Sequence, residues 1–155
     1  MESEIKINNF FNLYEQLYVG DTIKRLLTQR WTGPYKSAIV VAALLHDVGH
    51  LAPGSHTAFK TWFPGKKDSH EDIAVRIISE DPQIKSLLEN FDPTLANTVA
   101  EILSESDKLP RWTWQIISGG GWNVDRGNWC IADSILAGVS YGKYNIHALS
   151  NALTV

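Results

Sequence analysis

Apolar and polar residues alternate along this chain with the spacing of α-helices almost throughout. From about residue 8 to residue 30, apolar side chains recur at helical spacing, which predicts an amphipathic helix. Gly33 and Pro34 interrupt this pattern, and a proline suits the first turn of a new helix. That second predicted helix runs to His46 and contains the continuous apolar run of residues 38–45, which indicates a buried helix.

Turn-forming residues divide the remainder of the chain into shorter helices. Residues 51–67 contain two prolines and two glycines, which predicts a loop with one short helix. Aspartates at 81 and 92 each stand before a proline, a pairing typical of helix starts. Because no segment carries a convincing hairpin signal, the sequence predicts an all-α fold of six or seven helices. The later helices are predicted from Asp68 or Ser69 through Ile78 and over about 81–90, 92–105, 123–138 and 145–152.

Length and composition narrow the class of protein. The 155 residues are enough for one domain with its own core, so we expect a single domain over residues 1–155. A net charge of −3 argues against general nucleic-acid binding, although it leaves room for a local basic pocket that takes a nucleotide. The lone cysteine, Cys130, leaves no internal disulfide and suits a reducing cytoplasm. Neither a transmembrane stretch nor a signal-peptide pattern occurs, so we expect a cytoplasmic protein without a membrane partner.

Candidate chemistry begins at the end of the apolar run, with His46-Asp47-Val48-Gly49-His50. Two imidazoles and a carboxylate at the end of a buried helix are costly unless something pairs with them. Imidazole nitrogen and carboxylate oxygen are together good ligands for divalent metals. Adjacent His and Asp side chains converge on one ion best at a helix end, and we expect Gly49 to end the helix. The alternative is that His46 and Asp47 form a structural pair that binds no metal.

The string ALLHDVGH resembles the signature of the HD-domain metal-dependent phosphohydrolases. The segment 115–142 is similar to the late motif of one branch of that superfamily, the deoxynucleoside triphosphate triphosphohydrolases. This resemblance implies that Asp125 is a distal metal ligand and that Arg126 contacts phosphate. It also implies that Trp129 lies beside the sugar and that Asp133 lies near the sugar 3′-hydroxyl. A solvated surface charge is the competing interpretation of Arg126.

The middle of the chain resembles the same branch at residues 49–59 and 69–72. The resemblance implies that His70 is an acid–base or phosphate-contacting residue, helped by His50 or His56. Lys66 precedes His70 closely enough to suggest a second phosphate contact. Ordinary loop histidines and a solvated lysine are the alternatives.

The chain departs from this family pattern near its start. The family has a first metal-ligand histidine where the best match here is Gln16, and no histidine precedes His46. An amide oxygen is neutral and weaker than imidazole for borderline metals. Three explanations stay open: an engineered substitution that disables the enzyme, a natural variant that uses a harder metal, or a non-catalytic relative.

We therefore expect a divalent metal (Mn2+, Mg2+, Co2+, Fe2+ or Zn2+) held by His46, Asp47, Asp125 and Gln16. The expected reaction is hydrolysis of a nucleotide phosphate bond, with a deoxynucleoside triphosphate preferred. A nucleoside monophosphate phosphatase, a di-iron oxygenase and a nucleotide-binding module without turnover stay open as alternatives. The expected partner is a small-molecule nucleotide, and the resemblance also implies a homo-oligomer.

Overall fold

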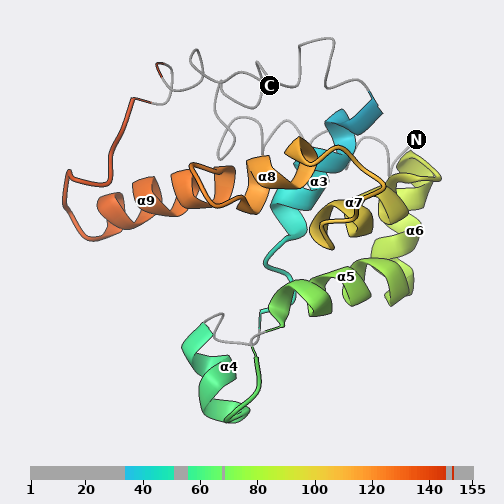
Figure 1. The fold of residues 1–155 in the computed structure, drawn as a ribbon, viewed down its shortest axis with the longest axis horizontal. Coiled ribbons are helices and arrows are strands. Elements are labelled where there is room, and N and C mark those ends of the chain that lie inside the picture. Colours follow the sequence, from blue (N-terminus) through green and yellow to red (C-terminus); the bar gives the residue numbers. More distant parts are fainter. Residues whose placement is uncertain (1–33, 51–55, 68, 146–147, 149–155) are drawn as a thin grey trace. The chain divides into compact units, whose positions relative to one another are not determined.

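A computed structural model describes residues 34–50, 56–67, 69–145 and 148. Within these residues the chain forms helices and no strand, which confirms the predicted all-α fold (Figure 1). The described residues divide into two compact units: a central unit within residues 38–110, and a terminal unit that contains residues 34–37 and 111–145. The prediction of one domain over residues 1–155 stays a prediction. The described helices are α3 (Lys36–Leu45), α4 (His56–Trp62), α5 (His70–Glu80), α6 (Pro82–Phe91), α7 (Leu95–Leu103), α8 (Trp112–Ser118) and α9 (Val124–Leu136).

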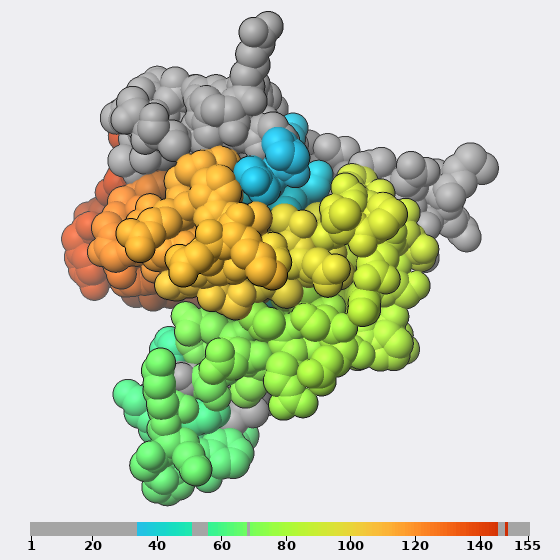
Figure 2. All heavy atoms as spheres, turned by 45° about the vertical axis from the view of Figure 1, so that its right-hand side comes forward, coloured from blue at the N-terminus to red at the C-terminus, as the bar shows by residue number. Residues whose placement is uncertain are grey.

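The central unit is built around α5, which packs against α6 and α7, while α6 also packs against α7. Ala74 and Ile78 of α5 are fully buried, and so are Val99 and Ile102 of α7. These pairs are spaced by three or four residues, which puts both members on one helix face. Burial of such faces stabilises the unit because it removes apolar area from water. Figure 1 and Figure 2 both show α4 and the turn after it standing out from α5.

Helix α3 confirms the prediction of a buried helix. All six residues from Ala38 to Ala43 are buried, none more than 4% exposed. The helix ends at Leu45, however, so the expectation that Gly49 ends it is wrong. The chain instead turns at once, with the backbone N–H of Val48 donating to the carbonyl of Leu45 at 3.1 Å. The HD pair therefore lies on a tight turn and not inside the helix.

Capping residues explain where the next helices begin. The side chain of Asp81 accepts hydrogen bonds from the backbone N–H groups of Gln83 and Ile84 and so caps α6, as the sequence predicts. Asp92 does not start α7 directly. Its carboxylate accepts from both the backbone N–H and the hydroxyl of Thr94 at 2.8 Å, which makes a turn first. The helix accordingly begins at Leu95, three residues later than predicted.

The terminal unit contributes α8 and α9, which pack against each other. Buried Asn123 joins them: its side chain accepts from the N–H of Arg126 and donates to the carbonyl of Gly119, both at 2.7 Å. Helix α8 was not predicted, because Arg111 at its N-cap offers no capping oxygen and the segment lacks an amphipathic stripe. The predicted helix at 8–30 lies outside the described residues, and the one at 145–152 does so almost entirely. None of the described helices has the length and apolar character that crossing a membrane requires.

Candidate metal and catalytic site

His46 and Asp47 open the turn that follows α3. Nδ1 of His46 lies 2.8 Å from the carbonyl oxygen of Ala43, and because a carbonyl only accepts, this nitrogen carries the proton. When the ring is neutral, its lone pair is then on Nε2, which is 3.3 Å from Oδ1 of Asp47. Nε2 of His50 lies 3.4 Å from that same oxygen. One carboxylate oxygen thus faces two imidazole nitrogens.

The donor set of His46 and Asp47 fits a divalent metal. An imidazole lone pair and a carboxylate oxygen are both electron-rich, so their separation of 3.3 Å is favourable when a cation lies between them. Two ligand atoms about 2.1 Å from a tetrahedral metal are about 3.4 Å from each other. The carbonyl of Ala43 fixes the ring of His46, as the outer partners of metal-binding imidazoles do. Both residues belong to the central unit, so this fit depends on that unit alone.

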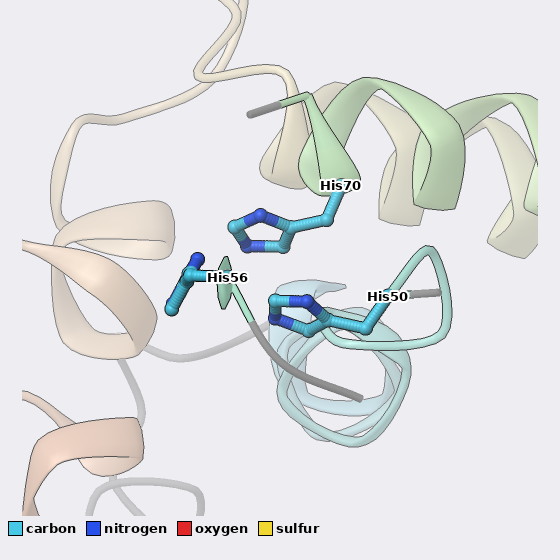
Figure 3. A group of neighbouring side chains, drawn as sticks. All are labelled: His50, His56 and His70. Atoms are coloured by element: carbon cyan, nitrogen blue, oxygen red, sulfur yellow. The ribbon is translucent and has the colours of Figure 1, made fainter. Parts of the chain in front are cut away.

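Three histidines from separate segments of the central unit lie side by side (Figure 3). The rings of His50 and His70 are stacked, with centroids 3.9 Å apart and an interplanar angle of 11°. His56 meets both rings nearly edge-on, at centroid distances of 4.9 and 5.1 Å. His50 and His70 are mostly buried, whereas His56 is exposed, so the group opens to solvent on the His56 side. The structure brings together the three histidines that are predicted to take part in proton transfer. That role stays a prediction.

Gly49 allows the turn after α3 to approach α5 closely. A side-chain carbon at this position would collide with the carbonyl of His70 and with the backbone nitrogen of Ala74. Glycine is therefore required by the close contact between two backbones. This contact places His50, the next residue, beside His70.

Four residues predicted to bind metal or substrate lie on α9, in the terminal unit. Asp125, Trp129 and Asp133 are spaced by four residues and share one helix face, and the last two are exposed. Arg126 donates to the carbonyls of Gly120 and Gly121 at 3.3 and 2.6 Å, so its guanidinium holds the glycine turn. That Asp125 joins the site of His46 and Asp47 stays a prediction.

Two predicted site residues remain, Lys66 and Gln16. Lys66 is exposed in the turn after α4, where its backbone N–H donates to the carbonyl of Phe63 at 3.0 Å. Gln16 lies outside the described residues, so its place as a metal ligand stays a prediction.

Two groups that the structure places at this site were not predicted from the sequence. The carbonyl of Ala43 orients His46, and nothing in the sequence marks it because every residue carries a carbonyl. Oε1 of Glu71 lies 4.0 Å from Nε2 of His70, on an exposed side chain. Its position directly after His70, within the family-like residues 69–72, was a signal that could have found it.

Comparison with known proteins gives a family match that contains the whole central unit. Residues 19–120 match the family described as the HD domain. This range contains His46, Asp47 and all three clustered histidines, and it excludes Gln16 and Asp125. The match therefore does not test these last two as ligands.

Two bacterial proteins illustrate the wider similarity. The chain is 34% identical over 140 residues to the uncharacterized protein MG461 homolog of Mycoplasma pneumoniae, covering 81% of this chain and 31% of that protein. It is 28% identical over 148 residues to the uncharacterized protein YwfO of Bacillus subtilis, covering 93% of this chain and 32% of that protein. The chain thus spans about a third of the length of the curated relatives it matches. No solved structure matches it significantly.

Proposed function

This chain belongs to the HD-domain family, whose members are generally phosphohydrolases, and we propose that it hydrolyses a phosphate bond of a nucleotide in a metal-dependent reaction. The observation that carries this proposal is the oxygen of Asp47 that faces both His46 and His50, with His70 stacked on His50. A metal-binding pair and candidate proton donors then lie within one compact unit. Hydrolysis of a phosphate bond needs both.

Each residue of the site has its own proposed role. His46 and Asp47 would hold the metal, with Asp125 and Gln16 as the further ligands that the sequence predicts. A metal held there would supply Lewis-acid chemistry, polarising a phosphoryl oxygen and making water a better nucleophile. His70 would donate a proton to the leaving oxygen, and its ring is held in place by the stacked ring of His50. Exposed His56 would contact the phosphate on the open side of the group.

A deoxynucleoside triphosphate is the substrate that we propose. Support comes from the late sequence motif, whose residues Asp125, Trp129 and Asp133 share one face of α9. An aromatic ring and a carboxylate on one face suit a sugar, because the ring packs on its apolar side and the carboxylate accepts from a hydroxyl. Lys66 and Arg126 are the proposed cations for the phosphates; Arg126 would have to exchange its contacts with the glycine turn for phosphate.

A nucleotide panel tests the proposal directly. Deoxynucleoside tri- and monophosphates are incubated with the chain in Mg2+, Mn2+, Co2+ or Fe2+, and phosphate, pyrophosphate and triphosphate are resolved as products. We expect triphosphate release that disappears in Asp47→Asn, with Lys85→Ala, a half-exposed charge on α6, as the matched control. Release from monophosphates alone would favour a monophosphatase, and binding without turnover would favour a nucleotide sensor.

A further inference from the structure

The group of His50, His56 and His70 offers ligands of a single kind. One nitrogen from each ring lies within 4.8 Å of the corresponding nitrogens of the other two. Such an all-nitrogen set prefers Zn2+, Co2+, Ni2+ or Cu2+ over Mg2+ and Mn2+, which favour oxygen. The pair of His46 and Asp47 is mixed in character and accepts either group of metals. The two sets therefore differ in selectivity.

We propose that His50, His56 and His70 form a second metal site, which binds a transition metal such as Zn2+ and thereby inhibits hydrolysis. The inhibitory part rests on the proposed function, because it requires these imidazoles to transfer protons or contact phosphate. An imidazole that donates its lone pair to a metal cannot also serve as a proton donor through that nitrogen. The binding part stands on the geometry of the three rings alone.

Metal binding would require the three rings to move. Ligands of a tetrahedral zinc lie about 3.4 Å apart, given Zn–N bonds of about 2.1 Å, so the three nitrogens must draw closer. A bound metal lies in the plane of each imidazole, and the rings of His50 and His70 are stacked within 11° of parallel. At least one of them must therefore turn out of the stack. The ring of His56 is exposed and lies edge-on to the other two (Figure 3).

The surroundings of the three rings support a cation. Carboxylate oxygens of Asp47 and Glu71 lie 3.4 and 4.0 Å from Nε2 of His50 and His70, respectively. Carboxylates beside metal-binding imidazoles orient the rings and raise their basicity. Three protein ligands leave a fourth position for water, and the exposed side at His56 gives a path of entry.

The experiment measures Zn2+ binding by calorimetry in excess Mg2+. Because Zn2+ also enters the mixed pair, the unaltered chain is compared with a variant that keeps that pair. We expect one Zn2+ equivalent of the unaltered chain to lose at least about tenfold in affinity in His56→Ala. His56 is exposed, so its removal leaves the fold intact, which circular dichroism checks. Lys60→Ala, one turn further along α4 and also exposed, is the matched control and should bind Zn2+ as the unaltered chain does.

A second variant and a second readout make the result decisive. His70→Gln should lose the same Zn2+ equivalent. Co2+ bound to the unaltered chain should give the visible absorption of a low-coordinate nitrogen site, and both variants should lack this absorption. Unchanged Zn2+ affinity in His56→Ala and His70→Gln would overturn the proposal. A chain that binds Zn2+ as expected but hydrolyses no nucleotide in Mg2+ or Mn2+ would refute the proposed function and leave the metal site standing.

Discussion

The ring of His50 stacks on the ring of His70, with centroids 3.9 Å apart, because Gly49 lets two backbones touch. His50 lies on the turn after α3 and His70 begins α5. The stack therefore depends on the contact between a turn and the first turn of a helix.

Replacing Gly49 by alanine should damage both stability and activity. The added methyl group meets backbone atoms of His70 and Ala74, which cannot rotate away as a side chain would. We expect about 1–3 kcal/mol of lost stability, as overpacking typically costs, measured by urea unfolding. Gly121→Ala is the control, since a carbon there meets nothing within 4 Å. Equal stability of the two variants would show that the turn and α5 are not in close contact.

Restoring a histidine at position 16 should strengthen metal binding and hydrolysis together. Imidazole gives a borderline metal more electron density than a neutral amide does. Loss of outer partners alone costs about 10- to 100-fold in affinity or activity, so a gained inner ligand should contribute at least as much. Titration with Mn2+ and initial rates on Gln16→His and the unaltered chain measure both effects. Identical values in the two proteins would mean that position 16 is outside the site.

The ionised side chain of Asp92 should raise the free energy of unfolding at neutral pH. The hydrogen bond from the backbone N–H of Thr94, and then that from its hydroxyl, holds the pKa of Asp92 below its usual 3.8. A lowered pKa means that the stabilisation is present above pH 3.8 and is lost as the pH falls through the lowered value. Asp92→Asn should therefore unfold at a lower temperature at pH 7, and this difference should shrink toward pH 3. Thermal melts across that range measure it, and a difference that grows on acidification would contradict the assignment.

Tyr144 should make the chain sensitive to alkali. Burial raises the pKa of its hydroxyl above 10, because the charged form would lose hydration. A raised pKa means that its contribution is complete below pH 10 and falls as the pH rises through the higher value. Tyr144→Phe should flatten the decline in melting temperature between pH 9 and 11, with Tyr141→Phe, an exposed tyrosine, as the control. A decline of equal slope in Tyr144→Phe and the unaltered chain would refute this.

The helices that the sequence predicted well are those whose signal is local. The apolar run of α3 is buried residue by residue, and Asp81 caps α6 through its own side chain. Helix α8 was not predicted because it has no capping side chain and is held by packing against α9. The start of α7 was misplaced because Asp92 uses its oxygen to hold a turn with Thr94.

The candidate site was predictable in its chemistry and not in its geometry. Histidine and aspartate can be recognised as possible metal ligands from the sequence alone, wherever they occur in the chain. That Gly49 serves close contact, and that His50 stacks on His70, depends on where α5 lies relative to the turn. Such a relationship between distant segments is set by tertiary packing, which no local pattern of residues encodes.

Helix α4, which carries His56, has a single buried residue, Phe59, with the ring of Phe63 lying 5.2 Å from it. So small an anchor implies a low free energy of local opening, well below that of α5 and α7. Amide hydrogens of α4 should accordingly exchange with solvent sooner than those of the helices beside it. The third histidine would then leave its place more often than the other two, and a ligand that binds all three would make this opening rarer.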